Sequence, residues 1–247
     1  MKEKDVKTKL AKELKRKFQH VYKDIQVDVN IKHLSKKLEQ ILDPLPAPKL
    51  QPDIDLLFTH VNNMVTVTEV KYFRPKRRSL NLSYYEGLSQ ALALLQYGFD
   101  AVSLMYIFDY KIFLSRTKHE KEQILQQYGG HAWRFIRKMV DRKRRAFGRL
   151  GVGLDFTCVI YDPRFKKPRG SEFQVVPMNW RRQTLKIQNL KPGYLCPLKD
   201  WKYRNPFVIN NDRTAKKIRD LILADLSKNK KNHKMKNKHR RSKQNRS

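Results

Sequence analysis

An amphipathic helix between residues 31 and 42 is the first element that the apolar pattern predicts. Its apolar side chains recur at the three- and four-residue spacing that aligns them on one helical face. These positions are Ile31, Leu34, Leu38, Ile41 and Leu42. Pro44 ends the helix, and the proline-rich "PLPAPK" that includes it forms a rigid connector.

A β-hairpin is predicted next. Residues 51–60 and 64–73 are apolar, β-branched segments of strand length, and they meet at the sequence "VNNM". Asn62 and Asn63 tolerate the positive φ that a tight reversal needs. The two strands should therefore pair antiparallel across these asparagines.

A helix and further strands follow the hairpin. "SYYEGLSQALALLQYG" begins with a capping box formed by Ser83 and Glu86, and Gly98 suits the position just after a helix end. The apolar run over 100–114 is typical of a strand buried on both faces, and a long basic helix is expected over 119–147. "GLDFTCVIYD" and "FQVVPM" predict two more strands. The order is α-β-β-α-β with additions, an α/β sandwich around a mixed central sheet.

Four ionisable side chains interrupt the apolar hairpin. Asp53 and Asp55 lie two apart in "PDIDLLF", and Glu69 and Lys71 lie two apart in "TEVKYF", so each pair projects from one face of its strand. A two-residue loop would send Asp55 and Glu69 to opposite faces of the hairpin. A three- or five-residue loop centred on Asn62 would instead set Asp55 opposite Glu69 and Asp53 opposite Lys71. The sequence leaves both registers open.

The second register would bring together the groups needed to hydrolyse a phosphodiester. Two nearby carboxylates suit Mg²⁺, or Mn²⁺, which keeps several waters and accepts one or two protein carboxylates. Such an ion lowers the pKa of a bound water, and a lysine beside it stabilises developing negative charge. The alternative is a pair of exposed salt bridges, but an unneeded charge is costly in an apolar segment.

The overall charge points to a polyanionic partner. The chain has 247 residues, with 55 Lys and Arg against 23 Asp and Glu, and a formal net charge of +32. A compact protein with this charge repels itself unless anionic partners or solvent offset the repulsion. The chain length fits one domain with appendages.

The charge is unevenly spread along the chain. The last 21 residues (227–247) hold ten Lys or Arg and no acid, which predicts a disordered tail behind a single domain over 1–226. Removing those ten leaves 45 basic against 23 acidic residues, or +22. Basic clusters over 74–78 and 137–149 therefore favour nucleic acid over solvated helix faces alone.

Other classes of protein find little support in the sequence. Cys158 and Cys196 are too few and too far apart for a disulfide framework or a CxxC zinc site. No apolar run approaches the ~18 residues of a membrane span, and the N-terminus lacks the apolar stretch of a signal peptide. We therefore expect a soluble intracellular protein, cytoplasmic or nucleoid-associated. No phosphate-binding loop or histidine metal spacing occurs.

"PDIDLLF", "TVTEVKYF" and "YYEGLSQALALL" together resemble the PD-(D/E)XK nuclease superfamily, which has the restriction-endonuclease-like fold. The resemblance covers roughly residues 31–110, and its α-β-β-α-β order agrees with the order predicted above. It implies a metal-dependent nuclease in which Glu69 and Lys71 are the acid and lysine of the second strand. Either Asp55 or Asp53 is the aspartate of the first strand, and we favour Asp55, with Asp53 as a supporting group.

The resemblance implies two further site residues. Many members place a glutamate of the first helix near the metal, and Glu39 fits that position, although a solvated helix face is the alternative. Relatives of the RecB-type nucleases use a glutamine and a tyrosine on the helix after the hairpin. Gln90 is the match, with Tyr84 or Tyr85 as candidate contacts unless these tyrosines are core-edge aromatics.

The sequence as a whole predicts a Mg²⁺-dependent nuclease that acts on DNA rather than RNA. Basic residues after the hairpin and in the predicted basic helix should bind backbone phosphates. They are Arg74, Arg77, Arg78, Arg142, Lys143, Arg144 and Arg145. The alternative is a nucleic-acid-binding protein, for DNA or RNA, that has the same fold and no catalytic activity.

Overall fold

The computed structural model of the chain describes residues 1–42, 53–75, 87–130, 133–134, 138, 154–165, 171–176, 188–189, 205, 208 and 212–244. The helices are α1 (Glu3–Lys17), α2 (Ser35–Leu42), α3 (Leu88–Leu95), α4 (Lys118–Leu125) and α7 (Arg213–Gln244). The strands are β1 (Tyr22–Val29), β2 (Ile54–His60), β3 (Val65–Phe73), β4 (Ala101–Asp109), β5 (Leu154–Tyr161), β6 (Phe173–Val175) and β7 (Gln188–Asn189). Short helical turns cover Lys32–Leu34, Tyr110–Phe113, Gln126–Gly130 and Pro163–Phe165.

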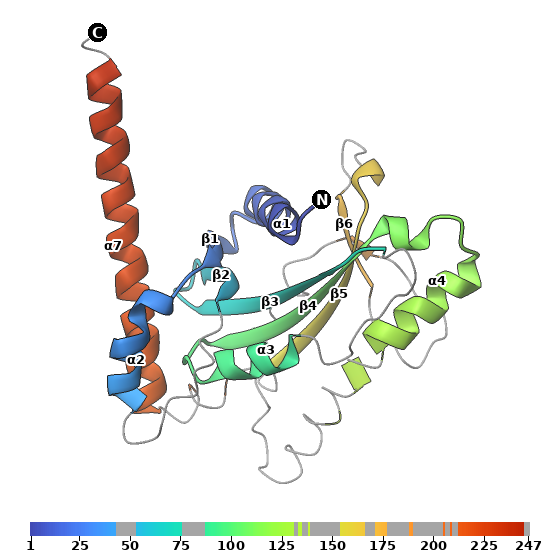
Figure 1. Cartoon of the computed structure of the whole chain (residues 1–247), viewed down its shortest axis with the longest axis horizontal. Helices are drawn as coiled ribbons and strands as arrows, with labels where there is room; N and C mark the ends of the chain where they lie inside the picture. The colour runs from blue at the N-terminus through green and yellow to red at the C-terminus, as the bar shows by residue number, and fades with distance from the viewer. Residues whose placement is uncertain are drawn as a thin grey trace.

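Within the described residues, the strands form one seven-stranded sheet in chain order, β1 to β7. β1, β2 and β3 are antiparallel, β3, β4 and β5 are parallel, and β5, β6 and β7 are again antiparallel. α3 lies in the connection from β3 to β4, and α4 in the connection from β4 to β5 (Figure 1). This arrangement confirms the predicted α/β class with a mixed central sheet.

Helices cover both faces of the sheet. α1 packs its apolar stripe of Val6, Leu10 and Leu14 on one face, in a cluster that includes Phe58 and Met105. α2, α3 and the first half of α7 contribute to a second cluster on the other side. β4 lies between them with all nine residues buried, as its continuous apolar run predicts. No helix within the described residues combines the length and apolarity needed to cross a membrane.

The core begins earlier in the chain than the resemblance suggests. α1 and β1 precede residue 31, and β1 extends the hairpin by pairing antiparallel with β2. The predicted helix over 31–42 exists as a short turn followed by α2, but it packs beside α7 (Figure 1). The first helix on the sheet is therefore α1, whose narrow apolar stripe lies among many lysines.

Gly87 and Gly98 bound the helix after the hairpin. α3 begins at Leu88, and its N-cap Gly87 has a φ of +79°. The capping box predicted at Ser83 and Glu86 lies outside the described residues. Gly98 has a φ of +69° just after the helix, close to its predicted role. A Cβ on Gly98 would collide with the backbone carbonyl of Ala215, so this glycine lets α7 approach closely.

The C-terminal segment departs from its prediction. Disorder is expected for 227–247, whereas α7 continues through Gln244. Asp212 caps its start by accepting from the Thr214 and Ala215 N–H groups (2.8 and 3.0 Å), and Ile218 is buried in the core. A helix nucleated by packing extends at little further cost through Lys, Arg and Gln, which are good helix formers.

The long basic helix predicted over 119–147 is only partly described. α4 ends at Leu125 and continues as a wider turn over Gln126–Gly130. Beyond this turn the structure describes 133–134 and 138 alone, so the basic cluster over 142–145 lies outside the described residues.

Replacing Gly98 by alanine tests the docking of α7. The Gly98→Ala substitution should lower the free energy of unfolding by at least about 2 kcal/mol, because it combines left-handed strain with a backbone collision. Denaturant unfolding measures this loss, and limited trypsin digestion should show faster cleavage at the basic residues of α7. A change below about 0.5 kcal/mol, the usual range for surface substitutions, would contradict the packing described here.

Candidate functional site

The hairpin adopts one of the two registers that the sequence allows. β2 and β3 pair in the register Leu56↔Thr68, and the His60 N–H donates to the Met64 carbonyl (2.8 Å). The loop therefore holds three residues, and Asn63 closes it with a φ of +64°. Both the centred loop and the positive φ of an asparagine confirm the sequence interpretation.

This register sets Asp55 opposite Glu69, one pair beyond Leu56↔Thr68. The β2–β3 ladder of backbone pairs ends at Leu56↔Thr68, although β3 continues to Phe73. The Asp55 side chain takes over where the ladder stops, because its Oδ2 accepts a hydrogen bond from the Val70 N–H (2.7 Å). Asp55 therefore satisfies a backbone donor that β2 does not reach.

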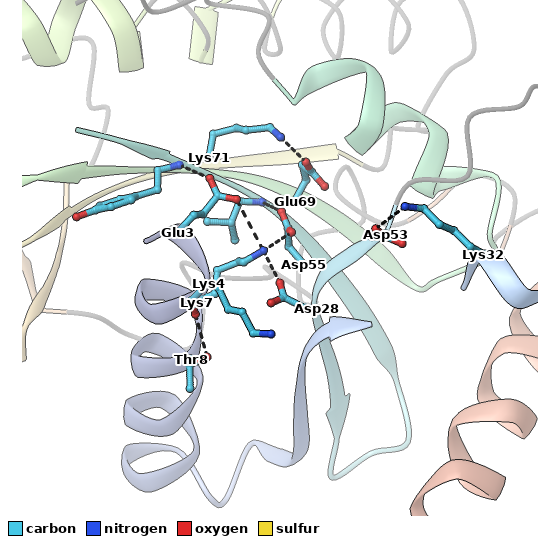
Figure 2. Close-up of polar contacts among 12 residues, drawn as sticks. Glu3, Lys4, Lys7, Thr8, Asp28, Lys32, Asp53, Asp55, Glu69 and Lys71 are labelled. Atoms are coloured by element: carbon cyan, nitrogen blue, oxygen red, sulfur yellow. Dashed lines mark hydrogen bonds and ion pairs between the residues drawn. The ribbon is translucent and has the colours of Figure 1, made fainter. Parts of the chain in front are cut away.

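α1 supplies two more charged groups to the same place (Figure 2). Glu3 Oε2 accepts from the Tyr72 N–H (3.1 Å), the next outward donor along β3. Lys7 donates to Asp55 Oδ1 (2.6 Å), forms an ion pair with Asp28 of β1, and lies 3.7 Å from Glu3 Oε1. We call Glu3, Lys7, Asp28, Asp55, Glu69 and Lys71 the acid cluster.

Glu3, Lys7 and Asp28 are site residues that the sequence analysis missed. The available signal was the Glu3–Lys7 spacing of four at the start of α1, which places both side chains on one helical face. Glu39 was expected to provide the glutamate of the first helix. That helix is α1 rather than α2, and the cluster receives Glu3; the Glu39 side chain lies outside what the structure describes.

Glu69 is the most buried member of the acid cluster. The residue is 1% exposed, and its Oε1 accepts from the Lys71 ammonium (2.9 Å). Its Oε2 is also buried and has no hydrogen-bond partner within the described part of the chain. Burial and the nearby Asp55 charge raise the pKa of Glu69 to about 7, although Lys71 opposes this shift.

Lys71 is held by Glu69 and by a glycine. Burial alone would lower the pKa of Lys71, but the Glu69 charge and hydrogen bond outweigh burial and raise it. The aliphatic stem passes over Gly87, where an added Cβ would lie 2.7 Å from Lys71 Cε. A glycine is therefore needed at position 87 for two reasons. It adopts the positive φ at the start of α3, and it leaves space for the Lys71 side chain.

The other predicted site residues lie apart or beyond the described residues. Asp53 pairs with Lys32 (3.4 Å) and is directed away from Asp55 in Figure 2. This placement does not support its shared role with Asp55. Gln90 lies in the first turn of α3 and is partly exposed. Arg74 donates to the Met1 carbonyl (3.1 Å). The residues outside the described ranges are Arg77, Arg78, Tyr84, Tyr85, Arg142, Lys143, Arg144 and Arg145.

Neither a family model, a curated protein nor a solved structure matches this chain. Among the described residues, no group of three or more histidine, cysteine, aspartate or glutamate side chains is arranged to hold a metal ion. A metal ion proposed for the acid cluster would therefore have fewer than three of these side chains as ligands.

The pKa of Glu69 predicts how stability depends on pH. A carboxyl whose folded pKa lies above its ordinary 4.5 favours the folded state below pH 4.5, and this contribution is lost as the pH rises through about 7. Glu69→Gln removes the buried charge, so in EDTA it should unfold at higher free energy than the unsubstituted protein at pH 8, by about 1–3 kcal/mol. The gain should shrink towards pH 5.

Denaturant unfolding at both pH values checks this expectation, and the comparison at pH 5 controls for the shape of the amide. A loss of stability at both pH values would show that the Glu69–Lys71 ion pair is a net stabilising contact. The burial of Glu69 would then need no further explanation.

Proposed function

We propose that this chain is a divalent-metal-dependent nuclease, with Asp55, Glu69 and Lys71 at its active site. The observation that carries the proposal is the buried Glu69 Oε2, which lacks a partner among the described residues beside a second carboxylate and a lysine. A buried carboxylate is costly unless its oxygens are paired. Strongly perturbed acids of this kind are frequent at functional sites.

A purely structural role explains some of these acids but not Glu69. Asp55 and Glu3 each cap a backbone donor of β3, which is sufficient reason for a polar side chain at those positions. Glu69 caps no donor that the structure describes, and its one described partner is Lys71. A hydrocarbon pair in place of Glu69 and Lys71 would avoid the cost of burial.

The residues fit Mg²⁺ or Mn²⁺. Asp55 and Glu69 would hold the ion, and two carboxylates suffice because Mg²⁺ retains several waters and also binds substrate phosphate. Glu3 is close enough for its charge to act on both Glu69 and Lys71. When bound, the ion would lower the pKa of a water and offset phosphate charge.

Lys71 would stabilise the charge that develops on the phosphate oxygens during hydrolysis. Its ammonium is held by Glu69 Oε1 at 2.9 Å. Its aliphatic stem packs against Gly87, which has no side chain to obstruct it. A charge that is already in place needs no reorganisation when the transition state forms, which is why such groups are effective. Glu69 has to be ionised to bind the ion, so the affinity for the metal should fall as the pH drops below about 7.

The basic surface supports a nucleic-acid substrate, and we favour DNA over RNA. The net charge of +32 and the acid-free second half of α7 suit a phosphate backbone. Figure 1 shows α7 projecting beyond the rest of the chain. A second candidate is a nucleic-acid-binding protein without catalysis, and the observation that favours it is the Lys7 ammonium, which already neutralises part of the acid cluster.

A cleavage assay separates these two functions. Duplex, single-stranded, flapped and branched DNA and RNA are incubated with the protein in Mg²⁺, Mn²⁺ or EDTA. Glu69→Gln and Lys71→Ala should each reduce metal-dependent cleavage by about 10²–10³-fold. Binding of the same substrate in EDTA should change little, because neither side chain is needed to position the backbone.

The matched controls are Glu122→Gln and Lys121→Ala, the same substitutions on α4 outside the acid cluster. Both should cleave at the unsubstituted rate. If the purified protein cleaves nothing in the panel, or if Glu69→Gln is as active as the unsubstituted protein, catalysis at this site is excluded. The second candidate function, a nucleic-acid-binding protein without catalysis, is then the one that the structure supports.

Removing residues 227–247 tests the contribution of α7 to binding. If this segment neutralises about six phosphates, the slope of log affinity against log salt should flatten by about 5 for duplex DNA. Cleavage at saturating substrate should persist. A version with every Lys and Arg of the segment changed to Gln keeps its length and controls for shape. An unchanged slope would show that the segment does not contact nucleic acid.

A further inference from the structure

Two turns meet where the parallel strands β4 and β5 end. β4 ends at Asp109 and β5 ends at Tyr161, and these two residues pair in the sheet. The turn Tyr110–Phe113 follows β4, and the turn Pro163–Phe165 follows β5 (Figure 1). Loops beyond the carboxyl ends of parallel strands are a common place for ligands in α/β proteins.

Arg164 connects these two turns by stacking on Tyr110. Its guanidinium carbon lies 4.3 Å from the centroid of the Tyr110 ring. The buried Asp162 accepts hydrogen bonds from Arg164 Nε (2.9 Å) and Nη2 (2.8 Å), which hold the guanidinium along one edge. The Arg164 side chain is nevertheless 60% exposed. The guanidinium is therefore a flat surface that is held in one orientation and is open to solvent.

Phe165 adds an exposed aromatic ring next to this arginine in the chain. The residue is 46% exposed, and no residue of its turn is buried. A single exposed phenylalanine is ordinary on its own. Here it adjoins an arginine that is held flat against a tyrosine, at a cost in side-chain entropy that surface contacts repay poorly. We call Tyr110, Arg164 and Phe165 the aromatic edge.

The aromatic edge has the chemistry that binds an unpaired nucleic-acid base. Bases stack on aromatic rings and on guanidinium planes, and such stacking accepts any base because each has a π-face. Asp162 offsets the Arg164 charge, so the flat face rather than the charge is what this arginine offers to a ligand. Lys111 is exposed next to Tyr110, and the net charge of +32 suits the phosphates that accompany a base.

The aromatic edge lies on the same side of the sheet as Lys71. Tyr110 packs against the core cluster that contains Phe73, and Phe73 lies two residues beyond Lys71 on β3, so both face that side. Lys71 pairs with Tyr106 of β4, four residues before Tyr110. At ~3.3 Å per residue, the aromatic edge is roughly 13 Å along the strands from Lys71. One strand of nucleic acid can therefore contact both places.

We propose that the aromatic edge stacks an unpaired base of single-stranded nucleic acid, so that the chain prefers ligands with a single-stranded region over plain duplex. The inference rests on the proposed function in one respect, namely that nucleic acid is the ligand. It does not depend on catalysis, because stacking is a binding interaction.

Fluorescence anisotropy in EDTA, with the full chain and a labelled single-stranded oligonucleotide, tests the inference. Phe165→Ala should weaken binding by about 5- to 150-fold, the usual range for one base on one ring. Phe165→Trp keeps a flat ring and should bind like the unsubstituted protein. Val61→Ala, which truncates an exposed apolar side chain in the β2–β3 loop, is the matched control and should have no effect.

A duplex of the same length is the second probe. Its bases already stack on one another, so Phe165→Ala should bind it as tightly as the unsubstituted protein does. Unchanged duplex binding also shows that the variant is folded. A third probe, a single strand with abasic sites, keeps the phosphates and lacks the bases. The unsubstituted protein should bind it more weakly than the intact strand, and Phe165→Ala should weaken that binding no further.

Arg164→Lys separates stacking from charge. Lysine keeps the positive charge but has no flat face, so single-strand binding should weaken by at least about fivefold. The slope of log affinity against log salt should stay the same, because the number of neutralised phosphates does not change. A flatter slope, with affinity lost equally for single strand and duplex, would show that Arg164 binds phosphate and would overturn the inference.

The remaining outcomes distinguish this inference from the proposed function. Equal single-strand affinity in the unsubstituted, Phe165→Ala and Arg164→Lys proteins overturns the aromatic edge and leaves the proposed nuclease standing. A change of oligomeric state in Phe165→Ala, measured by light scattering, would assign the ring to a contact between two copies of the chain and also overturn it. The expected losses of binding, without cleavage of any substrate, support the aromatic edge and remove catalysis. No binding to any nucleic acid overturns both.

Discussion

The arrangement of the candidate site depends on the point where the β2–β3 ladder ends. β3 continues past that point, and its outward N–H groups at Val70 and Tyr72 need acceptors that β2 does not provide. Carboxylates from Asp55 and Glu3 satisfy them, which brings negative charge to a place where hydrocarbon would otherwise pack. Buried backbone donors must be paired, so this demand alone draws acids into the sheet.

Once these acids are present, the surrounding charges follow. Lys7 offsets Asp55 and Asp28, and Lys71 offsets one oxygen of Glu69. The remaining oxygen of Glu69 is left without a described partner, and burial raises the pKa of this residue. The acid cluster is therefore a structure in which stability and proposed chemistry make opposite demands on one side chain.

The sequence predicts contacts between residues close together in the chain, but not contacts between segments that are far apart in it. Period-two spacing within one hairpin limited Asp55 and Glu69 to two possible registers, and the structure adopts the one that sets them opposite each other. Glu3 and Asp28 reach the same place through α1 and β1, and nothing in their local spacing indicates which strand they will meet. Gly87 is needed for a contact with Lys71 that only the folded chain creates. The helical end of α7 was missed because composition alone ignores nucleation by packing.

The close approach of Gly98 to Ala215 also has a mechanical meaning. It helps to fix the first half of α7 against the rest of the protein, so the second half extends as a rigid rod rather than as a flexible chain. From Leu226 to Gln244 the helix advances 18 residues, or roughly 27 Å at 1.5 Å each. A flexible basic tail samples many distances along a nucleic acid. If this segment binds duplex nucleic acid as proposed, the rigid helix would span one fixed distance, about eight base pairs at ~3.4 Å per pair.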